Sequence, residues 1–158
     1  MYKKILVAFD GSEPSRNALN HAVSIAVQLK AEINILSVVP RVSMPVFPDE
    51  GYGASSITMT QDFIEYQEKM RALYAKSLKE AEEEITEAFP DLKVSYKLLE
   101  GRPSSTIVDE AEKDSADLIV IGSRGLGSIT GWILGSTSRR VVESCTKPVL
   151  VVKSPMST

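Results

Sequence analysis

The sequence predicts a single α/β domain over residues 1–158, in which a five-stranded parallel sheet carries helices on both faces. Three observations lead to this fold class. The length of 158 residues suits one domain of ordinary size. The composition, with 43% hydrophobic and 25% charged residues, is that of a globular protein. Short β-branched apolar runs also alternate with longer segments of helical spacing.

Five short segments are predicted to be strands, the first because it is a short, β-branched apolar run that ends at a turn signal. They cover residues 5–9, 33–39, 94–99, 118–121 and 148–152. The first run stops at Asp10-Gly11, and Ser12 with the nearby Pro14 suits the start of a helix. Apolar residues at helical spacing continue this helix as far as Leu29.

The middle of the chain is predicted to hold one long loop and one long helix. Prolines, glycines and serines cluster between residues 40 and 58, and long loops in small domains are usually functional or mobile. In the helix that follows, charged residues mark a solvated face. The opposite face is predicted from apolar or small residues spaced by threes and fours: Phe63, Tyr66, Met70, Leu73, Ser77, Ala81 and Ile85. Two shorter helices are expected, one beginning after Gly101 and one over residues 136–144.

This alternation of strands and helices predicts a parallel sheet joined by right-handed crossovers. In such sheets, ligands bind at the carboxyl ends of the strands, near the point where the strand order changes direction. The segments that follow the strands are therefore the candidates for a binding site, above all the residues from Gly122 onward.

A glycine-rich segment joins the fourth strand to the last helix. Five glycines fall between Gly122 and Gly135, and glycine lets the backbone approach a ligand closely. Ser136 and Thr137 follow at the start of the helix, where free N–H groups and the helix dipole favour a phosphate. The alternative is that the glycines only shape a turn and Ser136 only caps the helix. Five glycines beside a buried strand favour an anion site.

Better-known phosphate motifs do not fit this segment. Gly122 and Gly127 are spaced as in a P-loop, but Ser128 and Ile129 stand where that motif requires lysine and a hydroxyl residue. A dinucleotide fingerprint would follow the first strand, not the fourth, and Lys153 ends the next strand where an acid would be needed for a ribose. The motifs of protein kinases are absent.

Charge and cysteine content exclude other classes of protein. The net charge of -3 and the pI of about 5.3 leave no basic excess for phosphates along a duplex, so no nucleic-acid partner is expected. Cys145 is the single cysteine, which excludes an internal disulfide and suits the reducing cytoplasm. No apolar stretch is long enough to span a bilayer, so no membrane partner is expected.

The combined pattern resembles the universal stress protein family. The spacing Gly122-x2-Gly125-x9-Gly135-Ser136 is similar to the Gly-x2-Gly-x9-Gly-Ser/Thr signature of its ATP-binding members. Further segments resemble that family in the same order along the chain: residues 5–12, 101–103, 116–122 and 147–152. The resemblance therefore covers essentially the whole chain.

The resemblance implies a Rossmann-like sheet of the adenine nucleotide alpha hydrolase type, ordered 3-2-1-4-5, with ATP across its carboxyl edge. Carried over by position, the nucleotide site would contain Ala8, Asp10, Val38, Ile121, Gly122, Arg124, Gly125, Gly135, Ser136 and Thr137. Asp10 would lie near the ribose or a phosphate-bound Mg²⁺ or Mn²⁺, and Val38 would contact adenine through its backbone. Gly125, Gly135, Ser136 and Thr137 would hold the phosphates, and Arg124 would add positive charge.

The resemblance also implies a homodimer formed by pairing the last strands, about Val149 to Val152. Together with the single cysteine, the resemblance implies a cytoplasmic, ATP-binding stress-response regulator that acts on an unknown protein partner. No catalytic residue is assigned. Two alternatives stay open: a slow ATPase in which Asp10 and a metal orient water, and a dimeric interaction module that uses no nucleotide.

Overall fold

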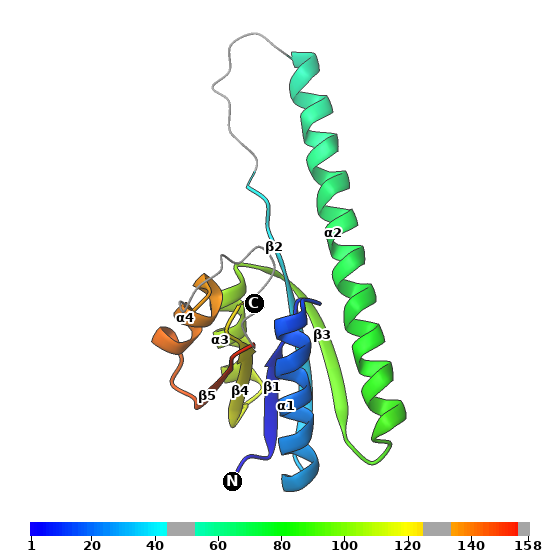
Figure 1. The fold of residues 1–158 in the computed structure, drawn as a ribbon. Helices are drawn as coiled ribbons and strands as arrows, with labels where there is room; N and C mark the ends of the chain where they lie inside the picture. The colour runs from blue at the N-terminus through cyan, green and yellow to red at the C-terminus, as the bar shows by residue number, and fades with distance from the viewer. Residues whose placement is uncertain (44–52, 125–133, 155–158) are drawn as a thin grey trace.

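A computed structural model describes residues 1–43, 53–124 and 134–154 of the chain. Strands and helices alternate along these residues (Figure 1). Their bounds are β1 Lys4–Ala8, α1 Glu13–Leu29, β2 Glu32–Pro40, α2 Gly53–Ala88, β3 Val94–Gly101, α3 Pro103–Lys113, β4 Leu118–Gly122, α4 Ser136–Ser144 and β5 Val149–Val152.

The five strands form one parallel sheet in the order β3-β2-β1-β4-β5, which confirms the predicted fold class. β1 lies at the centre, where Ile5 is paired with Ile33 of β2 on one side and with Leu118 of β4 on the other. β3 extends past the predicted Leu99 because it pairs with β2 as far as Gly101. Since all strands run the same way, their carboxyl ends meet at one edge of the sheet, the upper edge in Figure 1.

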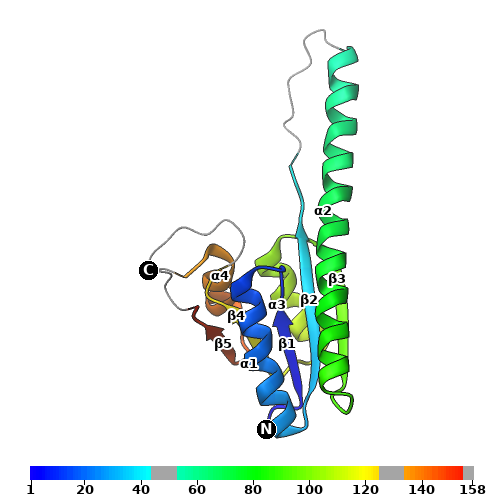
Figure 2. The ribbon, with the colours of Figure 1, turned by 45° about the vertical axis from the view of Figure 1, so that its right-hand side comes forward.

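Each face of the sheet is covered by two helices, as Figures 1 and 2 show. Side chains from α1 and α2 pack on one face, where the buried cluster includes Val7, Ile35 and Val120 of the sheet. The other face carries Leu6, Leu36 and Ile119 and is covered by α3 and α4. The central strands β1, β2 and β4 are thus apolar on both sides, as expected for a parallel sheet buried between helices.

Helix α2 differs from its prediction in two ways. It begins at Gly53, inside the predicted 40–58 loop. Tyr66 and Leu73, predicted on the apolar face, are 55% and 66% exposed, whereas Leu78 is buried.

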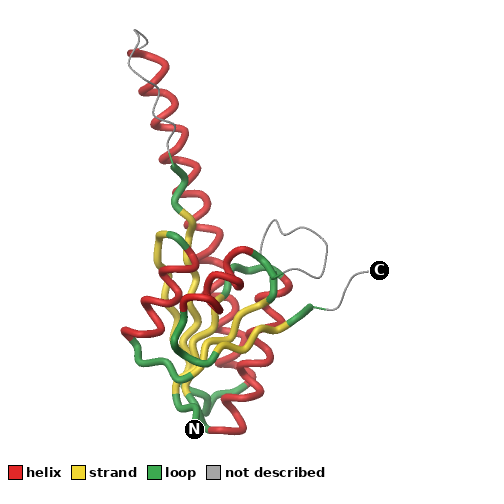
Figure 3. The backbone as a smooth tube through the Cα atoms, turned by 90° about the vertical axis from the view of Figure 1, so that its left-hand side faces the viewer, coloured by secondary structure: helices red, strands yellow, loops and turns green. Residues whose placement is uncertain are grey.

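Length explains the exposure of Tyr66, whereas Leu73 lies off the buried face of the helix, to which Leu78, Ala81 and Ile85 belong. The 36 residues of α2 span about 54 Å, but the nine residues of β2 span only about 30 Å. The amino-terminal half of α2 therefore projects beyond the sheet, which Figure 3 shows from the side. Although α2 is long, neither it nor another helix among the described residues is apolar enough to cross a membrane.

Candidate functional site

The carboxyl edge of the sheet has a switch point between β1 and β4. These strands are neighbours, but the chain leaves β1 for β2 on one side and leaves β4 for β5 on the other. The two crossovers also use opposite faces, since α1 packs in one core cluster and Val141 of α4 in the other. Diverging crossovers of this kind leave a crevice beyond the strand ends, and open α/β sheets bind their ligands there.

After β1, the chain makes a tight turn that fixes Asp10. Its Oδ1 accepts hydrogen bonds from the backbone N–H of Ser12 at 2.9 Å and from the Ser12 hydroxyl at 2.5 Å. Gly11 has φ of 83°, a left-handed conformation that few other residues adopt without strain. Ser12 then caps α1 by accepting a hydrogen bond from the N–H of Ser15. The turn residues that the sequence singled out thus hold the Asp10 carboxylate at the switch point.

Gly122, at the end of β4, lies against the start of α1. A Cβ atom at this position would be 2.9 Å from the carbonyl oxygen of Pro14, a distance that side chains do not tolerate. Glycine is therefore required for the end of β4 to pack beside the first turn of α1. This contact brings together the segments that follow β1 and β4, as the sequence predicted for the site.

The start of α4 is held against the end of β4 by Ser123. The carbonyl oxygen of Ser123 accepts hydrogen bonds from the N–H of Gly135 at 2.7 Å and from the Ser138 hydroxyl at 3.1 Å. Gly135 is the N-cap of α4, and among the described residues no side chain caps the helix there. Ser136 is exposed and Thr137 is partly exposed. Within the part of the chain that the structure describes, the positive end of α4 thus has no side-chain cap at the carboxyl edge, which is the arrangement expected of an anion site.

Three of the predicted site residues lie side by side on neighbouring strands. Ala8 of β1, Val38 of β2 and Ile121 of β4 belong to the same buried cluster, beneath α3 and α4. Each is less than a tenth exposed, so most of each side chain is already in contact with the protein. A ligand at this edge would meet their backbone and side-chain edges, in keeping with the backbone contact expected of Val38.

Arg124 follows directly on Ser123 and is partly exposed, next to the start of α4. Gly125 lies outside the described residues, so its predicted phosphate contact is not placed. The structure thus assembles the described members of the predicted set from three adjacent strand ends and one helix start.

Two residues of α2 flank this site and were not assigned to it from the sequence. A Cβ atom on Gly11 would be 3.1 Å from the Ser77 hydroxyl, so α2 lies against the turn that holds Asp10. Burial raises the pKa of the half-buried Tyr74, and the negative charge of Asp10 and then Tyr66 raise it further. Tyr74 therefore lies within electrostatic reach of Asp10. No motif marks these positions, because their proximity depends on how α2 packs across the sheet.

A metal at this edge would have to share its ligands with a bound molecule. Among the described residues, no group of three or more histidine, cysteine, aspartate or glutamate side chains is placed to hold a metal ion. One carboxylate, that of Asp10, together with phosphate oxygens and water, is a ligand set that suits Mg²⁺. The residues present are compatible with a metal that arrives with a phosphorylated ligand.

This order of elements and the glycines at the switch point match one family of proteins. Residues 1–153 match the sequence profile of the universal stress protein family. The chain belongs to this family. The universal stress protein MJ0531 of Methanocaldococcus jannaschii is 37% identical to it over 155 residues, which cover 98% of this chain and 84% of that protein.

Solved structures of other universal stress proteins share the fold. The universal stress protein UspA of Lactobacillus plantarum superposes on this universal stress protein with a TM-score of 0.78 and 25% identity, over 96% of this chain and 97% of that one. A universal stress protein solved in complex with cAMP superposes with a TM-score of 0.63 and 26% identity, over 96% and 97% of the two chains. These likenesses confirm the predicted family and fold.

Proposed function

We propose that this universal stress protein binds ATP at the switch point of its sheet and serves as a nucleotide-responsive regulator. The single observation that carries the proposal is the Ser123 contact, which sets the uncapped start of α4 beside the ends of β1 and β4. A phosphate chain at α4 would leave the base and ribose over the strand ends, within reach of Asp10 and Val38. The glycine spacing that resembles the ATP-binding signature supports the same assignment.

The comparison with known structures supports an adenine nucleotide. A universal stress protein of the same fold, 26% identical to this chain, was solved in complex with cAMP. The binding residues we assign to ATP are those predicted from the sequence, with Gly125 completing the set. We further propose that Asp10 binds Mg²⁺ or Mn²⁺ through the nucleotide phosphates, because a single carboxylate with phosphate oxygens suits these ions.

Regulation is favoured over rapid catalysis. The sequence has one histidine, His21, which is exposed on α1 about 13 Å along the helix from Ser12, with Nδ1 2.9 Å from the carbonyl oxygen of Asn17. It is therefore not placed to serve as a general base at the switch point. Any hydrolysis would depend on Asp10 and a bound metal to orient water, so we expect it to be slow.

Homodimerisation through β5 is the second part of the proposal. β5 is an edge strand, and Val149, Leu150 and Val151 are only partly buried. The carbonyl oxygens of Pro148, just before β5, and of Val152 accept hydrogen bonds from the N–H groups of Ile119 and Ser123, in and just after β4. By alternation, the backbone groups of Val149 and Val151 face the free edge, where a second copy of β5 would satisfy them. A dimer would present two nucleotide-dependent surfaces to a protein partner.

The nucleotide site is tested by releasing and identifying any nucleotide from the purified protein, followed by calorimetric titration with ATP, AMP and cAMP, with and without Mg²⁺. The decisive variant is Ser136→Asp. A carboxylate in the first turn stabilises a helix by about 0.3–1 kcal/mol, so this variant is expected to fold. It would repel a phosphate at the same place, and we expect at least about a tenfold loss of ATP affinity.

The matched control is Ser105→Asp, which puts the same charge into the first turn of α3 at an exposed position. This variant should bind ATP as the wild type does. If the wild type neither carries nor binds nucleotide, or if both variants bind equally well, the glycine segment is structural. The partly buried edge strand β5 would then favour the nucleotide-independent dimeric interaction module.

A further inference from the structure

A second concave site lies at the opposite, amino edge of the sheet. A groove of about 830 Å³ runs between the carboxyl-terminal ends of α1 and α2 and reaches the start of β1. Its volume falls in the range of pockets that bind small organic molecules, about 300–1,000 Å³. The groove shares no residue with the predicted nucleotide site, so a ligand here would be a second one.

The floor of this groove is apolar. It is formed by Ala26 and Val27 of α1 and by Phe89, Pro90 and Leu92, which follow α2. Val27 and Phe89 are 45% and 41% exposed, which is unusual for large apolar side chains that line a concavity. The described part of the chain leaves this surface uncovered, and burying it would stabilise a bound apolar group.

Lysines surround the apolar floor. Lys3, Lys4, Lys30 and Lys93 line the groove, against the acidic residues Glu32 and Asp91. Glu32 is already neutralised, because Lys93 lies 2.6 Å and Lys4 3.5 Å from its carboxylate, and the pKa of Glu32 is lowered mainly by the hydrogen bond from Lys93. Within the described residues, the ammonium groups of Lys3 and Lys30 have no ion-pair partner. The rim therefore has positive charge in excess.

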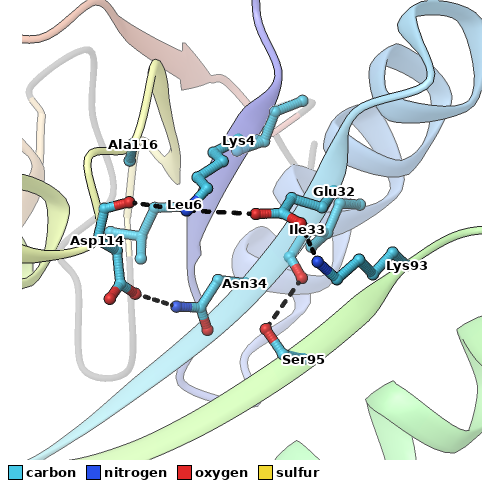
Figure 4. Close-up of a pocket in the computed structure, with 10 residues that line it drawn as sticks. Lys4, Leu6, Glu32, Ile33, Asn34, Lys93, Ser95, Asp114 and Ala116 are labelled. Atoms are coloured by element: carbon cyan, nitrogen blue, oxygen red, sulfur yellow. Dashed lines mark hydrogen bonds and ion pairs between the residues drawn. The ribbon is translucent and has the colours of Figure 1, made fainter.

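A smaller polar pocket of about 200 Å³ lies around the starts of β1 and β2 (Figure 4). Lys4, Glu32 and Lys93 line both, so the two cavities adjoin. In the polar pocket, the Asn34 amide donates to Asp114 at 2.5 Å, which leaves this acid partnered as well. The edge of the groove at the start of β1 and β2 therefore carries cations and hydrogen-bonding groups beside the apolar floor.

We propose that this groove binds an amphipathic carboxylate of medium chain length, with its alkyl chain over Val27 and Phe89 and its carboxylate at the lysine rim. The excess of lysine over unpaired acid selects an anion over a cation. The volume and the concave shape suit a single small molecule better than a flat protein partner.

The test uses hexanoate, octanoate and decanoate, titrated into the full chain by calorimetry, with decyltrimethylammonium as the cation of matched length. Each added methylene that is buried should strengthen binding by up to about fourfold. Decanoate should bind at one site per chain, and the cation at least about tenfold more weakly.

Two variants locate the site. Val27→Glu places a like charge over the floor and should weaken decanoate binding at least about tenfold. Val142→Glu is its matched control, because Val142 is also a valine that is 45% exposed on a helix, but on α4. Lys30→Gly removes one rim charge at a position of φ 54°, where glycine is favoured, so weaker binding there could not come from unfolding.

The proposal is overturned if decanoate does not bind, if affinity does not rise with chain length, or if the cation binds equally well. It is also overturned if Val142→Glu weakens binding as much as Val27→Glu does. Should sedimentation show a dimer that Val27→Glu dissociates while decanoate binds nowhere, the occupant of the groove is a second copy of the chain. None of these outcomes depends on whether ATP binds at the other edge.

Discussion

Gly135 donates its backbone N–H to the carbonyl oxygen of Ser123 at 2.7 Å, although eleven residues separate them in the sequence. This hydrogen bond joins the last residue before α4 to the first residue after β4. Ser138, one turn into α4, donates its hydroxyl to the same carbonyl at 3.1 Å. The amino end of α4 therefore has a fixed position relative to the end of β4.

Gly135→Ala is expected to disturb this junction. The added Cβ would lie 3.2 Å from the Ser123 carbonyl oxygen, closer than most side chains tolerate, while φ of −59° causes no strain of its own. We expect a loss of about 1–3 kcal/mol in the free energy of unfolding, measured in urea. ATP affinity should fall as well. Ser136→Ala, which adds no atom at the junction, should leave stability within about 0.5 kcal/mol, and an equal loss in both would contradict this explanation.

Lys97→Met is expected to destabilise the protein by leaving a buried acid unpaired. Glu110 of α3 is 3% exposed, and Lys97 of β3 forms an ion pair with it. The Lys97 ammonium also donates a hydrogen bond to Glu110, and this bond is the main reason that the pKa of Lys97 is raised. An orphaned buried polar group costs about 1–3 kcal/mol, which urea unfolding would measure. The double variant Lys97→Met, Glu110→Met should recover most of the loss, and no recovery would show that packing, not charge, accounts for it.

Asp117→Asn is expected to remove a pH-dependent contribution to stability. One carboxylate oxygen of Asp117 accepts the backbone N–H groups of Lys3 at 2.8 Å and Lys4 at 2.9 Å. These bonds lower the pKa of Asp117 in the folded protein, so its contribution is present above the unfolded pKa of about 4 and is lost as pH falls below it.

The measurement is the thermal midpoint of wild type and Asp117→Asn between pH 2 and pH 7. The wild type should be more stable at pH 7, and the two midpoints should converge in acid. The control is Asp109→Asn, which changes the net charge equally at an exposed position of α3. Its thermal midpoint should equal that of the wild type at each pH. If the thermal midpoints of wild type and Asp117→Asn differ by the same amount at every pH, the loss comes from poorer hydrogen bonding by the introduced amide and not from the missing charge.

The positions of the strands and turns could be predicted from the sequence because their signals are local, whereas the strand order was implied only by the family resemblance. Apolar runs marked the strands, and Ser12 with Pro14 marked the start of α1, which the structure confirms. The projection of α2 could not be predicted, since the exposure of Tyr66 depends on where the sheet ends beneath the helix. The burial of Glu110 could not be predicted either, because it depends on Lys97 of β3, which lies beside Glu110 only in the folded structure.

The residues of the candidate site also divide into those that a local sequence signal marks and those that it does not. Asp10, Gly122 and Gly135 carry local signals, namely a turn after a strand and glycines before a helix, and the structure gives two of these glycines steric reasons. Tyr74 and Ser77 carry none, because they reach the site through the packing of α2 against the turn at Gly11. The residues whose role is backbone geometry were thus predictable, and those that arrive by tertiary packing were not.

Val151→Pro separates dimerisation from folding. The N–H of Ser123 donates to the carbonyl of Val152, and that of Ile119 donates to the carbonyl of Pro148. The N–H of Val151 must therefore point to the free edge, so proline there leaves the bonds to β4 intact and is tolerated as in other edge strands. We expect a far-ultraviolet circular dichroism spectrum like that of the wild type, with a monomer in sedimentation at concentrations where the wild type is a dimer. In the control variant Leu150→Pro, the lost N–H is one that faces β4, so this variant should unfold the edge of the sheet. If the Val151→Pro variant is still a dimer, the interface lies elsewhere.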